Sequence, residues 1–173
     1  MRKDRILYGK LLLMAMLLGG LLNCQSGEEI NAVPSGTDLS QMEKDVLAKI
    51  NGHRRAIGLP ELRRYEPASE VARKHSEDLA AKRVSFGHVG FGERIDKLRA
   101  EIAISGAAEN EGYVENFADP VAAVVNAWLA SEGHRKNIEG NFDLAGTGVA
   151  KCGSEAFYFT VIFLRVAPGA TPH

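Results

Sequence analysis

The side chains of this 173-residue chain that could carry chemistry are spread along its length and form no standard catalytic string. There is no HExxH, paired CxxC, Walker loop or GxSxG. The glycine-rich stretch 87–92 does not follow a strand in a βαβ unit, which disfavours a nucleotide site. One local pair remains. Ser131 and His134 are one helical turn apart, so in a helix the imidazole could act as a base toward the serine hydroxyl. However, the sequence shows no glycine-rich elbow and no oxyanion donor near them.

Other polar side chains favour structural roles. His75 falls on the apolar face of an expected helix, so we expect a core histidine with a hydrogen-bond partner. We expect Arg94 to hold a loop through an ion pair, and Asn110 and Asn137 to hydrogen-bond loop backbone.

The elements that must position these side chains begin with four helices. Apolar residues recur at three- and four-residue spacing over about 39–57, from Pro67 to Leu79, and over about 93–102. A fourth helix is predicted to begin at Asp119-Pro120, because aspartate is a preferred N-cap and proline suits the first turn.

Strands are predicted toward the end of the chain. Residues 145–151 and 157–166 are rich in β-branched and aromatic residues, and Gly153-Ser154 supplies a turn between them. Residues 62–65 and 84–86 are candidates for further strands. Helices followed by a late hairpin indicate an α+β fold with layered elements.

The first 23 residues predict export. Basic residues precede an apolar run, 11–22, which is short for a membrane span of about 20 residues, and this order is typical of a signal peptide. The run ends in Leu21-Leu22-Asn23-Cys24, which resembles a lipobox, although Asn23 stands where Gly, Ala or Ser is usual. We expect cleavage before Cys24 and lipidation of its sulfur; cleavage by the ordinary signal peptidase is the alternative.

The remainder divides into a flexible tether (24–37), one domain (38–167) and a C-terminal tail (168–173). The whole chain has 21 basic and 22 acidic residues, and residues 1–23 contain four of the basic and one of the acidic ones. Without them, 17 basic and 21 acidic residues remain, a net charge of −4. This acidic balance argues against a nucleic-acid partner. If Cys24 is lipidated, Cys152 is expected to be a buried thiol; a Cys24–Cys152 disulfide is the alternative.

A series of segments resembles the bacterial branch of the CAP superfamily, also called the SCP domain. In chain order they are 51–54 (NGHR), 58–62 (GLPEL), 72–79 (ARKHSEDL), 85–94 (SFGHVGFGER), 108–110 (AEN), 128–138 (WLASEGHRKNI), 146–150 (GTGVA) and 158–163 (YFTVIF). The resemblance covers residues 40–165 and implies an α-β-α sandwich with a central antiparallel sheet. Departures include Glu132 in place of a proline and Val161 in place of a glutamine.

The resemblance also implies a cleft of two histidines and two acids, which binds a divalent metal in some members. His88 and Glu109 match the first histidine and acid, and His134 takes the place of the second histidine. Glu115 lies in a similar motif, but its distance from the segment that begins at Trp128 fits the family less well. The second acid is not clearly retained: Ser131 lies near its place, and Glu132 is an available substitute.

Two functions follow as expectations. The first is an extracytoplasmic module of the cell envelope that binds a small-molecule, peptide or lipid ligand in a cleft of His88, Glu109, Ser131 and His134. We expect it to be secreted or lipid-anchored through Cys24 to a bacterial membrane, the outer membrane where there are two. Zinc held by His88, His134 and Glu109 would suit the donor types.

The alternative function is a hydrolase of peptide or cell-wall substrates. It would use zinc-activated water with Glu109 as base, or Ser131 as nucleophile with His134 as base.

Overall fold

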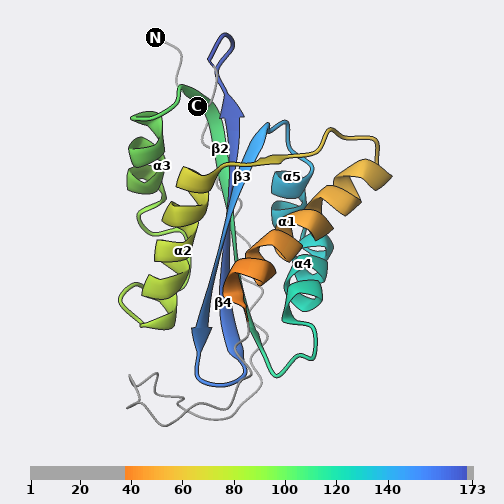
Figure 1. Cartoon of the computed structure of the whole chain (residues 1–173), viewed down its shortest axis with the longest axis vertical. Coiled ribbons are helices and arrows are strands. Elements are labelled where there is room, and N and C mark those ends of the chain that lie inside the picture. The colour runs from red at the N-terminus through yellow and green to blue at the C-terminus, as the bar shows by residue number, and fades with distance from the viewer. Residues whose placement is uncertain (1–37, 171–173) are drawn as a thin grey trace.

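Five helices and four strands follow one another in the computed structural model, which describes residues 38–170 (Figure 1). The elements are α1 (Leu39–Ala56), β1 (Arg63–Arg64), α2 (Glu66–Ala80), α3 (Phe91–Arg99), β2 (Ile104–Glu115), α4 (Pro120–Ala130), α5 (Glu132–Ile138), β3 (Leu144–Cys152) and β4 (Ala156–Val166). The predicted signal peptide, the tether and Cys24 lie outside the described residues. Among those described, no helix is both long and apolar enough to cross a membrane.

The helices begin where their local sequences predict. The Asp38 carboxylate accepts a hydrogen bond from the Gln41 N–H at the start of α1, and Asp119 accepts one from Ala122 at the start of α4. Each cap satisfies a backbone donor that has no partner within the helix. Pro67 lies in the first turn of α2, where its missing N–H costs nothing. All four predicted helices are therefore confirmed.

The sheet has the order β1-β3-β4-β2. Strand β4 pairs antiparallel with both β3 and β2, whereas the two-residue β1 runs parallel to β3. The late hairpin turns at Gly153, whose φ of 67° is a left-handed conformation that glycine adopts readily. The predicted hairpin and the strand within 62–65 are confirmed.

Four features differ from the expectations. Helix α5 has no counterpart among the four predicted helices. Strand β2 was not predicted, since its sequence ISGAAENEGYVE is rich in small and acidic residues. Residues 84–86 are loop rather than strand. Cys152 is disulfide-bonded, so the expected thiol is wrong for this structure. The only other cysteine of the chain, Cys24, lies before the first described residue.

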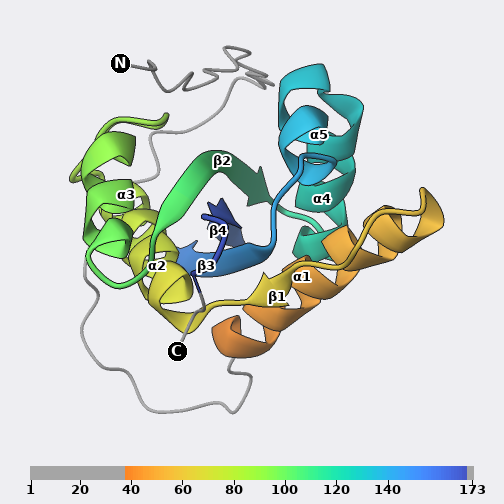
Figure 2. The same cartoon turned by 90° about the horizontal axis from the view of Figure 1, so that it is seen from above.

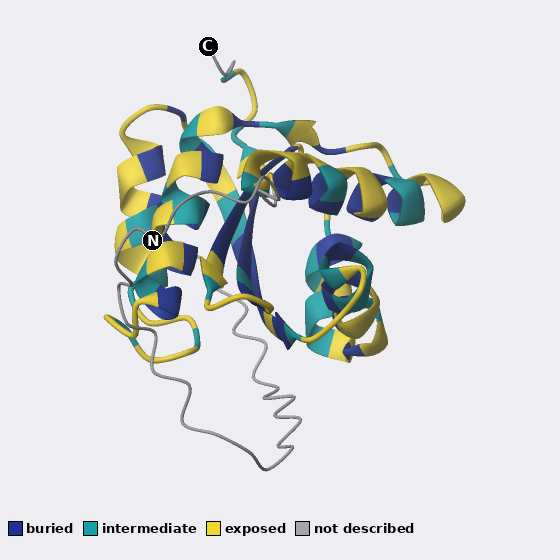
Figure 3. Cartoon of the chain, turned by 60° about the horizontal axis from the view of Figure 1, so that its bottom comes forward, coloured by how far each residue is buried: buried dark blue, intermediate teal, exposed yellow. Residues whose placement is uncertain are grey.

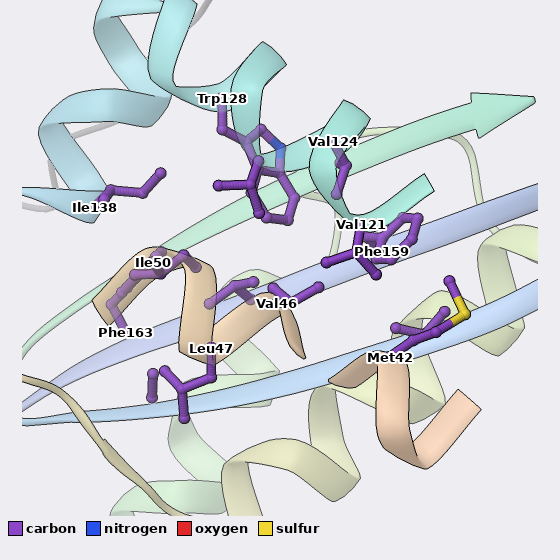
Figure 4. Close-up of a cluster of buried hydrophobic side chains, with 14 of the residues drawn as sticks. Met42, Val46, Leu47, Ile50, Val121, Val124, Trp128, Ile138, Phe159 and Phe163 are labelled. Carbon is purple, nitrogen blue, oxygen red and sulfur yellow. The ribbon is translucent and has the colours of Figure 1, made fainter. Parts of the chain in front are cut away.

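Helices cover both faces of the sheet. Helices α1, α4 and α5 pack on one face and α2 and α3 on the other, as Figure 1 shows, and this is the expected α-β-α arrangement. Figure 3 shows buried residues along the strands and exposed residues on the outer helix surfaces. Trp128 lies in the larger core with α1 side chains and Phe159 (Figure 4), and its indole N–H donates to the Glu111 carbonyl at 2.8 Å.

Helix α2 approaches β3 unusually closely. A Cβ on Gly146 would lie 2.2 Å from the Ala68 carbonyl carbon, and one on Gly148 would lie 2.1 Å from the Arg73 nitrogen. These distances are far shorter than van der Waals contact. The two glycines therefore allow α2 to lie directly against the strand.

Candidate functional site

The candidate site is built on β2, which forms one edge of the sheet. Side chains alternate between the two faces of a strand. The side chains of Glu109 and Glu111 therefore point toward α3 and α2. Asn110 points toward α5, and a Cβ at Gly112 would face α4. Figure 2 shows β2 passing between these two groups of helices. An edge strand lets groups from both layers approach the same place.

Glu109 is bound by an arginine and a histidine. The Arg94 guanidinium, from α3, donates from Nε to Oε2 at 2.9 Å and from Nη2 to Oε1 at 2.7 Å. His88 Nδ1 lies 3.1 Å from Glu109 Oε1. Burial acts to raise the pKa of the Glu109 carboxyl, but the hydrogen bonds from His88 and Arg94 outweigh it and hold the pKa below its usual value. Glu109 is therefore a buried, ionised and paired carboxylate.

Glu111 has different partners. His75 Nε2, from α2, lies 2.6 Å from Glu111 Oε1, and the Gly87 backbone N–H donates to Oε2 at 2.9 Å. The side chains of His75 and Glu111 are 3% and 2% exposed. Burial raises the pKa of the Glu111 carboxyl, and the nearby Glu109 charge adds to that effect, although the hydrogen bond to His75 opposes it. The prediction of a core His75 with a hydrogen-bond partner is confirmed.

We call His75, His88, Arg94, Glu109 and Glu111 the histidine–glutamate cluster. His88 is the member of the cluster that reaches solvent, because the His88 side chain is 37% exposed whereas that of Glu109 is 1% exposed. The hydrogen bond to Glu109 raises the pKa of His88 despite the opposing effect of burial. Arg94 also donates to the Val89 carbonyl at 2.8 Å, which confirms that it holds this loop.

His134 belongs to the opposite layer. Its carbonyl accepts a hydrogen bond from the Asn110 side chain at 3.1 Å, and the Asn137 side chain donates to the Glu109 carbonyl at 3.2 Å. These two asparagines fasten α5 to the edge of β2. The prediction that they bind backbone is confirmed, but the carbonyls belong to α5 and β2 rather than to loops. Burial lowers the pKa of His134, and the positive charge of His88 lowers it further. The charge of His88 therefore reaches His134 across the strand edge.

Among the described residues, neither Ser131 nor Glu132 has a side-chain hydrogen bond or ion pair with this cluster. The Ser131 hydroxyl is buried and has no hydrogen-bond partner within the described residues, so it makes no hydrogen bond to His134. The Glu132 side chain is 71% exposed and pairs with Lys136 at 2.6 Å. Glu111 is therefore the second acid beside Glu109. Sequence reasoning missed it because 104–115 was not recognised as a strand, in which residues two apart share a face.

Three members of the cluster could hold a metal ion. His75, Glu109 and Glu111 each offer a ligand atom, and these atoms lie within 4.8 Å of one another. Imidazole and carboxylate are donors that zinc accepts. However, Arg94 already engages both oxygens of Glu109, and a metal at Glu109 would face this guanidinium charge. The donor types fit zinc, whereas the charge around Glu109 does not.

Both carboxylates have partners within the cluster. They face one guanidinium and two imidazoles, all within hydrogen-bond or ion-pair reach. In the part of the chain that the structure describes, no serine hydroxyl is hydrogen-bonded to these groups. The site therefore offers charged and hydrogen-bonding groups for recognition more readily than an activated nucleophile.

Comparison with known proteins gives a consistent result. The sequence model of the Cysteine-rich secretory protein family (CAP) matches residues 47–163. Two Bacillus subtilis proteins are similar: the uncharacterized membrane protein YlbC, 37% identical over 126 residues, and the uncharacterized protein YkwD, 34% identical over 133 residues. The matches cover 71% and 75% of this chain but only 34% and 51% of those proteins.

Solved structures show the same architecture. An extracellular SCP-domain protein from Bacillus anthracis matches with a TM-score of 0.61 and 28% identity, over 78% of this chain and 45% of that one. An outer surface protein from Borrelia burgdorferi matches with a TM-score of 0.61 and 23% identity, over 75% of this chain and 96% of that one. At the lower identity the likeness concerns the fold alone.

Proposed function

The chain belongs to the cysteine-rich secretory protein (CAP) family, and from that premise we propose that it is an exported binding module of the cell envelope. Its similarity to an extracellular SCP-domain protein supports a location outside the cytoplasm. The signal-peptide-like order of basic and apolar residues before Cys24 supports the same location.

The ligand of this module is proposed to be a small molecule, peptide or lipid that contacts the edge of β2. His88 is the exposed member of the histidine–glutamate cluster, and His134 approaches from the other layer. The observation that carries this proposal is the two-point pairing of Arg94 with Glu109. A carboxylate held in this way is a fixed recognition group rather than a free base or a vacant metal ligand.

Zinc calorimetry separates this proposal from a metal-dependent one. We would titrate residues 36–173 with zinc chloride, beside His88→Ala, His134→Ala and Glu111→Gln. The expected result is no submicromolar zinc binding, since Arg94 occupies Glu109. Near-stoichiometric submicromolar binding that is lost in the variants would overturn the metal-free proposal and assign zinc to this cluster.

The hydrolase alternative is favoured by one observation, the triad of His75, Glu109 and Glu111 within ligand distance. It is tested by incubating the same protein with a peptide library and with peptidoglycan fragments. Product formation that vanishes in His88→Ala would establish an enzyme. Saturable binding without product is the outcome expected of the module.

We further propose that lipid on Cys24 holds the exported chain at a membrane, the outer membrane in a cell with two. The lipobox-like sequence before Cys24 supports this anchor. Stable attachment would require several acyl chains on that cysteine, since one chain binds only weakly. Cys152 is disulfide-bonded in this structure, and a lipidated Cys24 cannot be its partner, so the anchor requires a form of the chain in which these two cysteines are not paired.

A further inference from the structure

Three aromatic rings, two exposed and one half-buried (Tyr158), lie together beside the histidine–glutamate cluster. Phe86 is 54% exposed and Tyr113 is 43% exposed. The ring centroids of Tyr113 and Tyr158 lie 4.9 Å apart, and those of Phe86 and Tyr158 lie 6.4 Å apart. We call these three residues the aromatic ledge. Exposed apolar side chains that touch one another mark an interaction site more often than scattered ones do.

The fold holds the ledge in place. Tyr113 and Tyr158 are direct partners in the pairing of β2 with β4. Tyr113 follows Glu111 on the same face of β2, because residues two apart in a strand share a face. The Gly87 N–H is bound to Glu111, and this bond fixes the loop that carries Phe86. The rings are therefore positioned by two strands and one tethered loop.

A carboxylate borders the ledge. Glu115, the next residue on the same face of β2, accepts a hydrogen bond from the Tyr113 hydroxyl at 3.0 Å. Burial first, and then Glu115, raises the pKa of Tyr113 to about 12, and the same two causes raise the pKa of Tyr158. Both phenols therefore stay neutral at ordinary pH. Aromatic faces are themselves electron-rich.

The cationic members of the neighbouring cluster are already engaged. Arg94 and His88 both contact Glu109. Rings with an adjacent carboxylate complement a positively charged ligand. An ammonium with N–H groups would compete with Tyr113 for the Glu115 oxygens, whereas a quaternary ammonium has no N–H and leaves that hydrogen bond in place.

We propose that the aromatic ledge binds the quaternary ammonium group of a small, soluble choline-like molecule. Phe86, Tyr113 and Tyr158 supply ring faces, and Glu115 supplies the opposing charge. Open sites of this type bind weakly, so the expected Kd for choline is on the order of millimolar. This proposal rests on the proposed binding function and names a ligand for it. The site involves neither zinc nor the cleft histidines, so a negative result in the zinc titration does not decide the result of the experiment below.

The test is a proton NMR titration of residues 24–173 with choline chloride. The ligand methyl resonances should shift upfield through the ring currents, with saturation in the millimolar range. The control ligand is 3,3-dimethylbutan-1-ol, the uncharged isostere of choline, which should bind at least about fivefold more weakly. Equal affinity for the two ligands, or no saturable shift with choline, would overturn the proposal.

Variants locate the site. Phe86→Ala, on an exposed loop, and Glu115→Gln should each weaken choline binding at least about fivefold. Glu61→Gln removes the same charge at an exposed position outside the ledge and should leave the Kd unchanged. Unchanged binding in both ledge variants would place the ligand elsewhere and contradict the proposal. Binding to phosphatidylcholine vesicles without binding to free choline would overturn the assignment to a soluble ligand.

Discussion

Glu109 is the residue on which the cluster depends, because it is 1% exposed and holds Arg94, which is 11% exposed. Replacing Glu109 by glutamine would leave a buried guanidinium without its counter-charge. We expect the free energy of unfolding of Glu109→Gln to fall by about 3 kcal/mol, as measured by urea denaturation.

Two further variants check this explanation. Glu61→Gln, in an exposed pair with Arg55, should change stability by less than about 1 kcal/mol. Adding Arg94→Met to Glu109→Gln should recover part of the loss, since the uncompensated charge is then absent. A simple sum of the two single-variant losses would contradict the ion-pair explanation.

His88 and His134 should titrate on opposite sides of the usual imidazole value. The hydrogen bond to Glu109 raises the pKa of His88, whereas burial and the charge of His88 lower that of His134. Long-range ¹H–¹⁵N NMR of the imidazoles measures both values. In His88→Gln the pKa of His134 should move upward, because the neighbouring charge is gone; an unchanged value would disprove the electrostatic contact.

The raised pKa of His88 also predicts the pH dependence of stability. Since folding raises this pKa, protonation of His88 stabilises the fold fully below the unfolded value of about 6.5, and this contribution is lost as pH rises through the folded pKa. In urea denaturation, the stability difference between the wild type and His88→Gln should therefore shrink as pH rises from the unfolded value of about 6.5 through the folded pKa. A constant difference would show that His88 contributes through packing instead.

At the scale of elements, the contact of α2 with β3 positions His75. Helix α2 can bring this imidazole to Glu111 because Gly148 has no side chain to hold the helix away. We expect Gly148→Ala to lower the free energy of unfolding by roughly 2 kcal/mol or more, since the added methyl meets backbone atoms that cannot move independently.

Gly92→Ala is the matched control. Gly92 lies within α3, and a Cβ there would meet nothing within 4 Å. Alanine should therefore stabilise the helix slightly, by about 0.5–1 kcal/mol. Thermal or urea unfolding of both variants gives the comparison. Equal effects at the two positions would exclude the close approach of α2 as the cause.

At the scale of the whole molecule, the domain packs two helical layers on one sheet, and its proposed anchor belongs to the part of the chain before residue 38. Intact mass and peptide mapping of the protein recovered from its native membrane test the anchor. We expect an N-terminal Cys24 that carries a diacylglyceryl group and an amide-linked fatty acid. Cys24→Ser should abolish both and release the protein.

The same peptide map also detects the other outcome. A Cys24–Cys152 disulfide found under non-reducing conditions would overturn the anchor, because one sulfur cannot carry both a thioether and a disulfide. Export would still stand, since disulfides form outside the reducing cytoplasm.

Elements with local signals could be predicted from the amino-acid sequence alone. The cap at Asp119, the apolar periodicity of α1 and the turn at Gly153 each depend on residues within a few positions of one another. The ordered motifs from residue 51 to residue 163 also identified the family and, through it, the α-β-α architecture. His88 and Glu109 were named in this way, and the structure brings them together.

The features that escaped prediction depend on contacts between distant segments. Strand β2 is poor in the usual β-forming residues and is held by its pairing with β4, where Glu109 lies opposite Ile162 and Glu115 opposite Ala156. Without that strand, nothing in the sequence places Glu111 on the same face as Glu109 or beside His75 of α2. The composition of the cluster was therefore decided by the packing of α2, α3 and β2, because hydrogen bonds and ion pairs between separate elements leave no periodic pattern in the chain.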